Sequence, residues 1–74
     1  MNTEILNKFV DNRVTLHCWQ CNDLVKTGML ERISDQCYRV KNALGHVDFN
    51  SDNADSAIID KNGKINVNVA KIGE

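Results

Sequence analysis

Residues 56–71 read SAIIDKNGKINVNVAK, and they carry the clearest structural signal in the chain. Asn62-Gly63 stands between two apolar runs, which is the strongest short-range signal for a β-hairpin. After the turn, Ile65, Val67 and Val69 alternate with polar residues, so we expect these three side chains to point into a core. The sequence therefore predicts a closing hairpin built from residues 56–60 and 64–71.

The same alternation of apolar and polar residues predicts three earlier strands. Cys18 ends the apolar face of the first strand, and Tyr38 begins that of the third. Gly28, in the middle of the second strand, indicates a sharp bend or the close approach of another backbone. The predicted strands are residues 13–18, 24–31 and 36–41.

The segments before and after these strands differ in character. Ile5, Leu6, Phe9 and Val10 recur at helical spacing, which predicts a short amphipathic helix at the start of the chain. So short a helix does not persist alone in water, so it must pack on the sheet. Residues 42–55 give the weakest signal: residues 46–49 can extend a strand, and residues 50–55 are predicted as a polar, acidic loop.

Length and charge limit the classes of protein to consider. A chain of 74 residues has room for one domain with a modest core, and chains this short often gain stability by association. A net charge of −1 argues against a duplex-binding protein that relies on a basic face. We find no signal peptide or membrane-spanning segment, so we expect a cytoplasmic protein that does not bind membranes.

Several stretches resemble the Sm-like family, which includes bacterial Hfq and the archaeal and eukaryotic Sm and LSm proteins. EILNKFVDNRVTL at residues 4–16 is similar to the family's opening helix and first strand. TGMLE at 27–31 resembles the core of the first Sm motif, and SDQ at 34–36 with YRVKN at 38–42 resembles stretches of Hfq. The resemblance implies a mostly β fold over residues 1–74, namely a small, strongly bent, five-stranded open barrel (Sm-like or SH3-like) with a short N-terminal α-helix. It also implies a closed homo-oligomeric ring of about five to seven subunits, in which the outer edge of the last hairpin pairs with the next subunit.

By the same resemblance, the ring would bind short single-stranded RNA and would need no cofactor. The turn after the second strand and the turn of the closing hairpin share one end of a meander, so we expect their side chains to cluster. Two departures bear on the site: Cys37 occupies the place of Hfq's base-stacking aromatic residue, and Asp60-Lys61 replaces the family's Arg-Gly or Lys-His. The predicted RNA-binding residues are Arg32, Gln36, Lys61, Asn62 and Lys64.

Cys18, Cys21 and His46 offer an alternative, a zinc site that would stabilise the small domain. Cys-x-x-Cys at a turn with a later histidine is typical of tetrahedral zinc sites. Cys37 is expected at the opposite end of the second strand, roughly 20 Å away, so it cannot join the other two on one metal. The simpler interpretation, in which Cys18 and Cys21 are thiols and no metal is bound, is our prediction.

A second function class is a protein-interaction or inhibitor module, such as a phage could encode. Asp48, Asp52 and Asp55 of the predicted acidic loop, residues 48–55, would then engage a basic partner protein. Trp19, at the tip of the first hairpin, fits a stacking platform, a protein contact or a core residue.

Catalytic arrangements are not visible in the sequence. His17 and His46 could each approach a cysteine, but no orienting partner or oxyanion site accompanies them. We therefore expect a binding protein rather than an enzyme.

Overall fold

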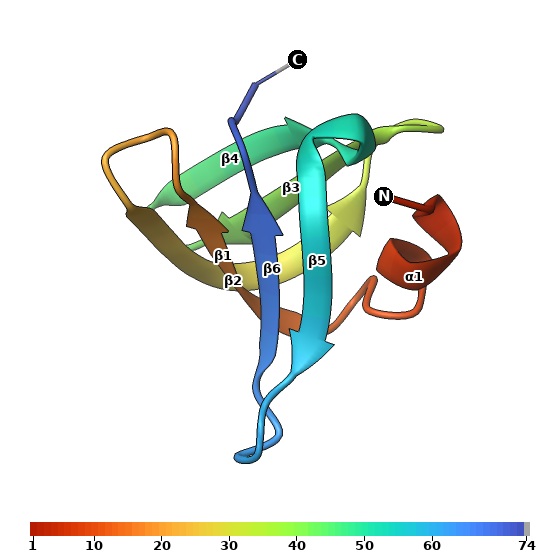
Figure 1. The fold of residues 1–74 in the computed structure, drawn as a ribbon, viewed down its shortest axis with the longest axis vertical. Helices are drawn as coiled ribbons and strands as arrows, with labels where there is room; N and C mark the ends of the chain where they lie inside the picture. The colour runs from red at the N-terminus through yellow and green to blue at the C-terminus, as the bar shows by residue number, and fades with distance from the viewer. Residues whose placement is uncertain (74) are drawn as a thin grey trace.

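The computed structural model describes residues 1–73 and is mostly β, as predicted (Figure 1). Neither of the helices in this part of the chain has the length and apolar character needed to cross a membrane. The elements are α1 (Thr3–Asn7), β1 (Arg13–Cys18), β2 (Leu24–Arg32), β3 (Cys37–Asn42), β4 (Gly45–Asn50), the 3-10 helix η1 (Ser51–Asn53), β5 (Ala54–Ile59) and β6 (Ile65–Val69).

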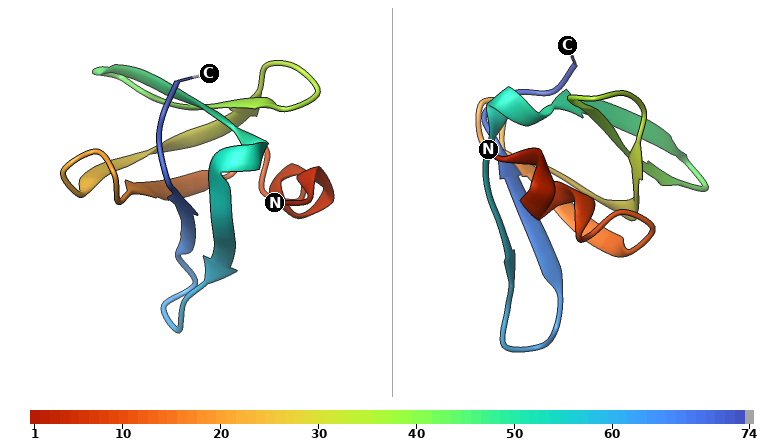
Figure 2. Two further views of the ribbon diagram at one scale, coloured as in Figure 1. Left: turned by 45° about the horizontal axis from the view of Figure 1, so that its top comes forward. Right: turned by 90° about the vertical axis from the view of Figure 1, so that its right-hand side faces the viewer.

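The six strands form one mixed sheet in the order β4-β3-β2-β1-β6-β5. Strands β1 to β4 make an antiparallel meander, and β6 returns parallel to β1. Although β4 and β5 lie at opposite ends of this order, only the three residues of η1 connect them. The sheet therefore curls until its two edges meet at this corner (Figure 2).

The structure has a six-stranded sheet that is not closed into a barrel, whereas we predicted a five-stranded open barrel. Within residues 1–73, no strand pairing joins the β4 edge to the β5 edge. The C-terminal tail instead reaches β4, where Gly73 donates its N–H to the Asp48 carbonyl (2.6 Å) and bridges to Phe49. The fold is thus a curled six-stranded sheet whose opening the tail crosses at one end.

The closing hairpin forms where the Asn-Gly signal predicted it. Strands β5 and β6 pair antiparallel, and Gly63 takes the left-handed conformation with φ of 79°. The Asp60 carboxylate accepts the N–H groups of Asn62 and Lys64, which fixes the turn. Val67 and Val69 are fully buried, so the predicted inward face of this strand is confirmed.

Gly28 is the point where β2 and β3 come together. A Cβ at this position would overlap the backbone carbonyl of Lys41, so only glycine fits. Strand β2 also changes partner here, pairing with β1 up to Met29 and with β3 from Met29 onward. The predicted close backbone approach at Gly28 is confirmed.

Helix α1 covers the core that the curled sheet encloses. Leu6 is fully buried, and Tyr38 of β3 donates its hydroxyl hydrogen to the Asn7 side chain (2.5 Å). The N-terminal amine of Met1 donates to the Ser51 carbonyl in η1 (3.0 Å). The remaining large side chains of the core come from the strands: Val14, Leu16, Leu30, Val40, Phe49, Val67 and Val69.

Residues 42–55, which gave the weakest signal in the sequence, contain β4, where residues 46–49 were expected to extend a strand, and η1 and the start of β5, where an acidic loop was expected. Strand β4 pairs with β3 along its whole length, and the rings of Tyr38 and Phe49 stack with centroids 5.9 Å apart. Arg39 binds the Asp48 carboxylate through two nitrogens, at 2.7 and 3.1 Å. These contacts with β3 stabilise β4 despite its polar sequence.

Candidate nucleic-acid interface

The structure separates the two turns whose side chains were expected to cluster. Gln36 lies in the β2–β3 turn, where its carbonyl accepts the N–H of Ser51 (2.8 Å), just before β5. The β5–β6 turn lies at the far end of β5, and six strand residues span roughly 20 Å. The β2–β3 turn and the β5–β6 turn are therefore far apart (Figure 1), and Arg32 and Gln36 are not brought together with Lys61, Asn62 and Lys64.

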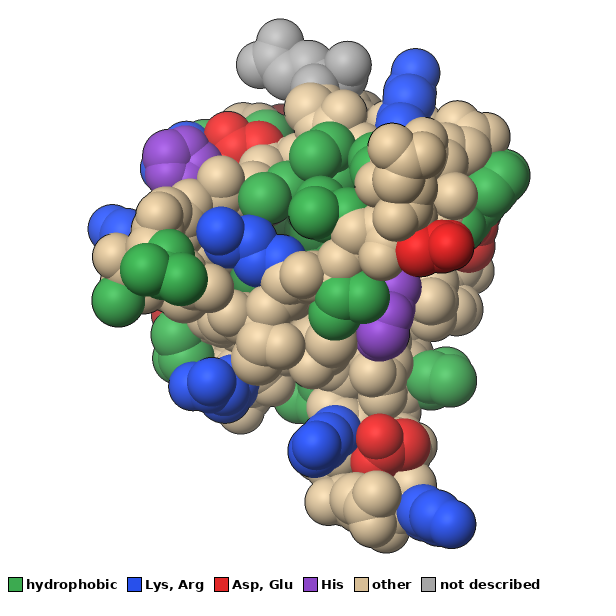
Figure 3. All heavy atoms as spheres, turned by 90° about the vertical axis from the view of Figure 1, so that its left-hand side faces the viewer, with side chains coloured by type: hydrophobic (Ala, Val, Ile, Leu, Met, Phe, Trp, Pro, Cys, Tyr) green, Lys and Arg blue, Asp and Glu red, His purple; other side chains and the backbone are tan. Residues whose placement is uncertain are grey.

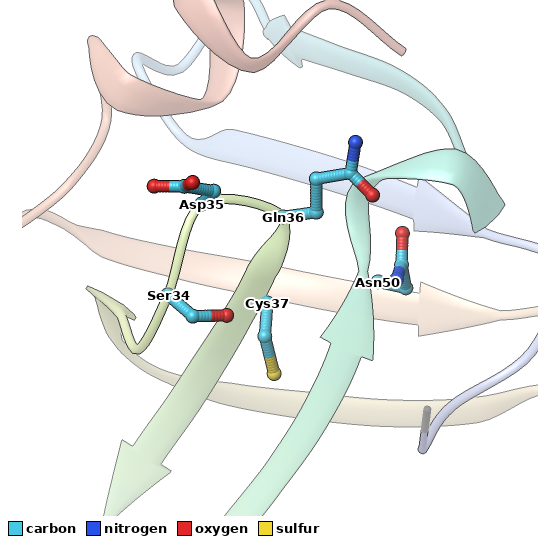
Figure 4. Close-up of a pocket in the computed structure, with 5 residues that line it drawn as sticks. All are labelled: Ser34, Asp35, Gln36, Cys37 and Asn50. Atoms are coloured by element: carbon cyan, nitrogen blue, oxygen red, sulfur yellow. The ribbon is translucent and has the colours of Figure 1, made fainter.

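The β2–β3 turn carries little available positive charge. Arg32 donates to the carbonyls of Ser34 and Asp35 and lies 3.5 Å from the Asp35 carboxylate. Gln36 lines an open hollow of about 690 Å³ together with Ser34, Asp35, Cys37 and Asn50 (Figure 4). This turn offers amide, hydroxyl and carboxylate groups, so it suits phosphate poorly.

A row of exposed side chains crosses the outer face of the sheet instead. Directly paired residues point to the same side of a sheet, and the register pairs Arg13 with Met29, Met29 with Lys41 and Lys41 with His46. Neighbouring strands lie about 4.8 Å apart, so this line extends roughly 14 Å from β1 to β4. Lys64 extends it, because it lines a hollow of about 370 Å³ together with Arg13. We call these five exposed residues the basic row: Lys64, Arg13, Met29, Lys41 and His46.

Polar side chains lie beside the basic row on the same face. The hydroxyl oxygens of Thr15 and Thr27 are 3.3 Å apart, and both residues line the hollow that contains Arg13 and Lys64. One strand further, Asn66 lies opposite Thr15, and its Oδ1 is 3.1 Å from His17 Nε2. Hydroxyl and amide groups of this kind hydrogen-bond sugars and base edges.

Acidic side chains limit the positive potential of the row. Hydrogen bonds from the N–H of Lys64, and then from Asn62 and Asn66, lower the pKa of the Asp60 carboxyl below its usual 3.8. Asp11 and Glu31 line a separate hollow of about 520 Å³ with Met29 and Lys41. On the face seen in Figure 3, basic side chains are spaced among polar and apolar groups rather than joined in one patch.

The zinc alternative does not match the geometry. Cys18 and Cys21 form a disulfide, so the prediction that they are thiols is wrong for this structure. His46 belongs to the basic row, level with Arg13 at the opposite end of β1 from Cys18. Within residues 1–73, no three His, Cys, Asp or Glu side chains are grouped to hold a metal ion.

Comparison with known proteins does not identify a relative. No protein-family model, curated protein or solved structure matches the chain. The function is therefore inferred from the geometry of the chain itself.

The sequence indicated only part of the basic row. Lys64 was predicted as a site residue, and the alternation in the first and third strands places Arg13 and Lys41 on the faces opposite Val14 and Val40. What joins them to His46 is the register of four strands, which alternation within each strand does not specify. The hairpin β3–β4, which brings His46 beside Lys41, is the element that the sequence indicated least.

Proposed function

We propose that the protein is an Sm-like homo-oligomer that binds short single-stranded RNA along the basic row. The observation that carries the proposal is the alignment of Lys64, Arg13, Lys41 and His46 across the sheet. Binding rather than catalysis, and a cytoplasmic location where RNA is present, belong to the same proposal.

The chemistry of the row suits a single strand better than a duplex. Lysine and arginine meet phosphates, whereas Met29, which is 45% exposed, offers apolar surface to an unstacked base. The hydroxyl groups of Thr15 and Thr27 and the side-chain amide of Asn66 beside them supply hydrogen bonds to riboses and base edges. Few phosphates are needed, which is compatible with the chain's net charge of −1.

Assembly would multiply these weak sites. The outer edge of β5 has no neighbouring strand within residues 1–73, and Ile58 and Ile59 on it are 57% and 60% exposed. An exposed apolar edge favours addition of a strand from another chain. Several sites on one ring raise the avidity for a strand long enough to reach them.

The alternative function, binding of a basic partner protein through the acidic residues 48–55, has less support from the structure. Asp48 is paired with Arg39, so one of the three carboxylates expected in an acidic loop is engaged, and the segment is strand and 3-10 helix rather than a loop. Asp52 remains exposed on η1. We therefore rank RNA binding above binding of a basic partner through residues 48–55.

The test is the affinity for labelled oligouridine and oligoadenosine of about 20 nucleotides, measured by fluorescence anisotropy at low salt. Replacing Arg13 and Lys41 together by alanine should weaken binding about tenfold or more. With three cations engaged, the logarithm of the affinity should fall with the logarithm of salt concentration with a slope near −2.

A matched double variant removes two positive charges elsewhere. Lys8 and Lys71 are exposed and lie outside the row, so Lys8→Ala with Lys71→Ala should change the affinity less than twofold. Arg32→Ala reports separately on the β2–β3 turn. Equal losses in the two double variants, or no binding of either oligonucleotide by the intact protein, would show that the row is not an RNA site.

A further inference from the structure

The Cys18–Cys21 disulfide presents a second surface feature at the other end of β1 from the basic row. The four-residue loop that it closes contains Trp19, the chain's single tryptophan, which is 57% exposed. Beside this loop lies a hollow of about 250 Å³. It is lined by His17, Cys18, Trp19, Asp23, Leu24, Val25 and Asn68.

Trp19 is held in one orientation although it is exposed. Its backbone N–H donates to the Val69 carbonyl (3.2 Å), and its indole Nε1–H donates to the Asp55 carboxylate (2.7 Å). The disulfide joins Cys18, immediately before Trp19, to Cys21, two residues after it. An aromatic face positioned in this way binds a flat ligand with little loss of conformational entropy.

The polar groups around the indole are mainly hydrogen-bond acceptors. Asp23 lines the hollow with an exposed carboxylate, and Asp55 adds a second negative charge at the indole edge. Asn68 donates its amide hydrogen to the Ser56 hydroxyl (3.1 Å), which leaves its carbonyl oxygen as an acceptor. Among residues 1–73, the lining of this hollow includes no lysine or arginine.

We propose that the hollow binds the guanidinium group of an arginine in an extended segment of a partner protein. A guanidinium is planar, stacks on an indole face through a cation–π interaction and donates in pairs to a carboxylate. Trp19 supplies the face, and Asp23 and Asp55 supply the compensating charges. Two carboxylates here disfavour an RNA phosphate, so charge complementarity selects the basic protein segment over the nucleic acid.

This site is independent of the proposed RNA-binding row, because the length of β1 separates them. Six strand residues span roughly 20 Å, and Arg13 begins β1 whereas Trp19 follows its last residue. The two proposals therefore fail or hold separately.

The direct probe is a capped ten-residue peptide of alternating arginine and glycine, titrated at low salt while the fluorescence of Trp19 is recorded. Saturable binding is expected, with at least threefold weaker affinity for the lysine–glycine peptide and none for the citrulline–glycine peptide. Lysine lacks the planar group that stacks, and citrulline lacks the charge.

Variants of the residues around the hollow test where the arginine peptide binds. Calorimetry measures the affinity, because it does not depend on the fluorescence of Trp19. Trp19→Ala should weaken it at least fivefold. Asp23→Asn and Asp55→Asn should each do the same, although asparagine at 55 keeps an oxygen to accept the indole N–H. Asp35→Asn removes the same charge from the distant β2–β3 turn and should leave the affinity within twofold.

Three results would overturn the proposal. One is an equal loss of affinity in Asp35→Asn and Asp23→Asn, which means diffuse attraction to an acidic protein. Another is peptide binding without any change in Trp19 fluorescence. The third is quenching of Trp19 by uridine or guanosine monophosphate with no response to the arginine peptide, which assigns the hollow to a nucleobase.

Discussion

At the scale of single residues, the fold depends on Gly28 because two backbones touch there. The carbonyl of Lys41 occupies the space that a Cβ would need, and a backbone carbonyl in a strand cannot move without disturbing the ladder. The same contact brings Met29 between Arg13 and Lys41, since β2 exchanges partners at this point. Gly28 therefore supports both the bend of the sheet and the alignment of the basic row.

Gly28→Ala should lower the free energy of unfolding by about 2 kcal/mol, the usual cost of inserting a methyl group into a closely packed site. Urea denaturation followed by circular dichroism measures this change. Val25→Ala, at an exposed position three residues earlier in β2, should cost less than about 1 kcal/mol. Equal stabilities of the two variants would mean that β2 and β3 do not approach as the structure describes.

At the scale of elements, the sequence predicted local structure well and long-range pairing poorly. The β5–β6 hairpin follows from Asn62-Gly63 and two flanking runs, all within one short stretch. Strand β4 also belongs to a local hairpin, with β3, but its polar residues resemble a loop, and the contacts that stabilise it, such as Tyr38 stacked on Phe49, exist only in the folded hairpin. The parallel pairing of β1 with β6 joins the two ends of the chain, and no periodicity within either strand indicates it.

The candidate site shows the same difference between local features, which the sequence predicted, and long-range pairing, which it did not. Lys64 was identified because its turn is a local signal, whereas the partnership of Arg13, Lys41 and His46 requires the register of four strands. The disulfide was missed for a related reason. The two cysteines were predicted as thiols, while the tight turn that brings Cys18 and Cys21 together is a property of the folded loop.

The disulfide loop should contribute modestly to stability, because the loop that it closes is very short. Chain-entropy arguments give about 2 kcal/mol for a loop of four residues. Reduction with dithiothreitol should lower the free energy of unfolding by no more than this and leave the protein folded. Urea denaturation with and without the reductant tests it, and the variant Cys21→Ser should not respond. Complete unfolding on reduction would contradict the central role given to the hydrophobic core.

At the scale of the whole molecule, the two edges of the sheet are not equivalent. The β4 edge is partly occupied, because Gly73 of the tail donates to the Asp48 carbonyl. The β5 edge presents exposed isoleucines on a hairpin that projects beyond the body of the sheet (Figure 1). Apolar side chains on a projecting edge strand are costly to leave in water, which favours association through this hairpin.

Assembly through β5 predicts that light scattering at micromolar concentration will give a mass of about five to seven times the 8.4 kDa of one chain. Ile58→Lys with Ile59→Lys should reduce that mass to one chain, because two charges on the edge oppose addition of a strand. Ile33→Lys adds a charge at another exposed isoleucine, in the β2–β3 turn, and should leave the mass unchanged. If this double variant is monomeric and folded and still binds a short oligonucleotide weakly, the basic row binds RNA without assembly, and assembly contributes only avidity. A wild-type protein that stays monomeric at every concentration would exclude the ring, and avidity could then contribute nothing to RNA binding.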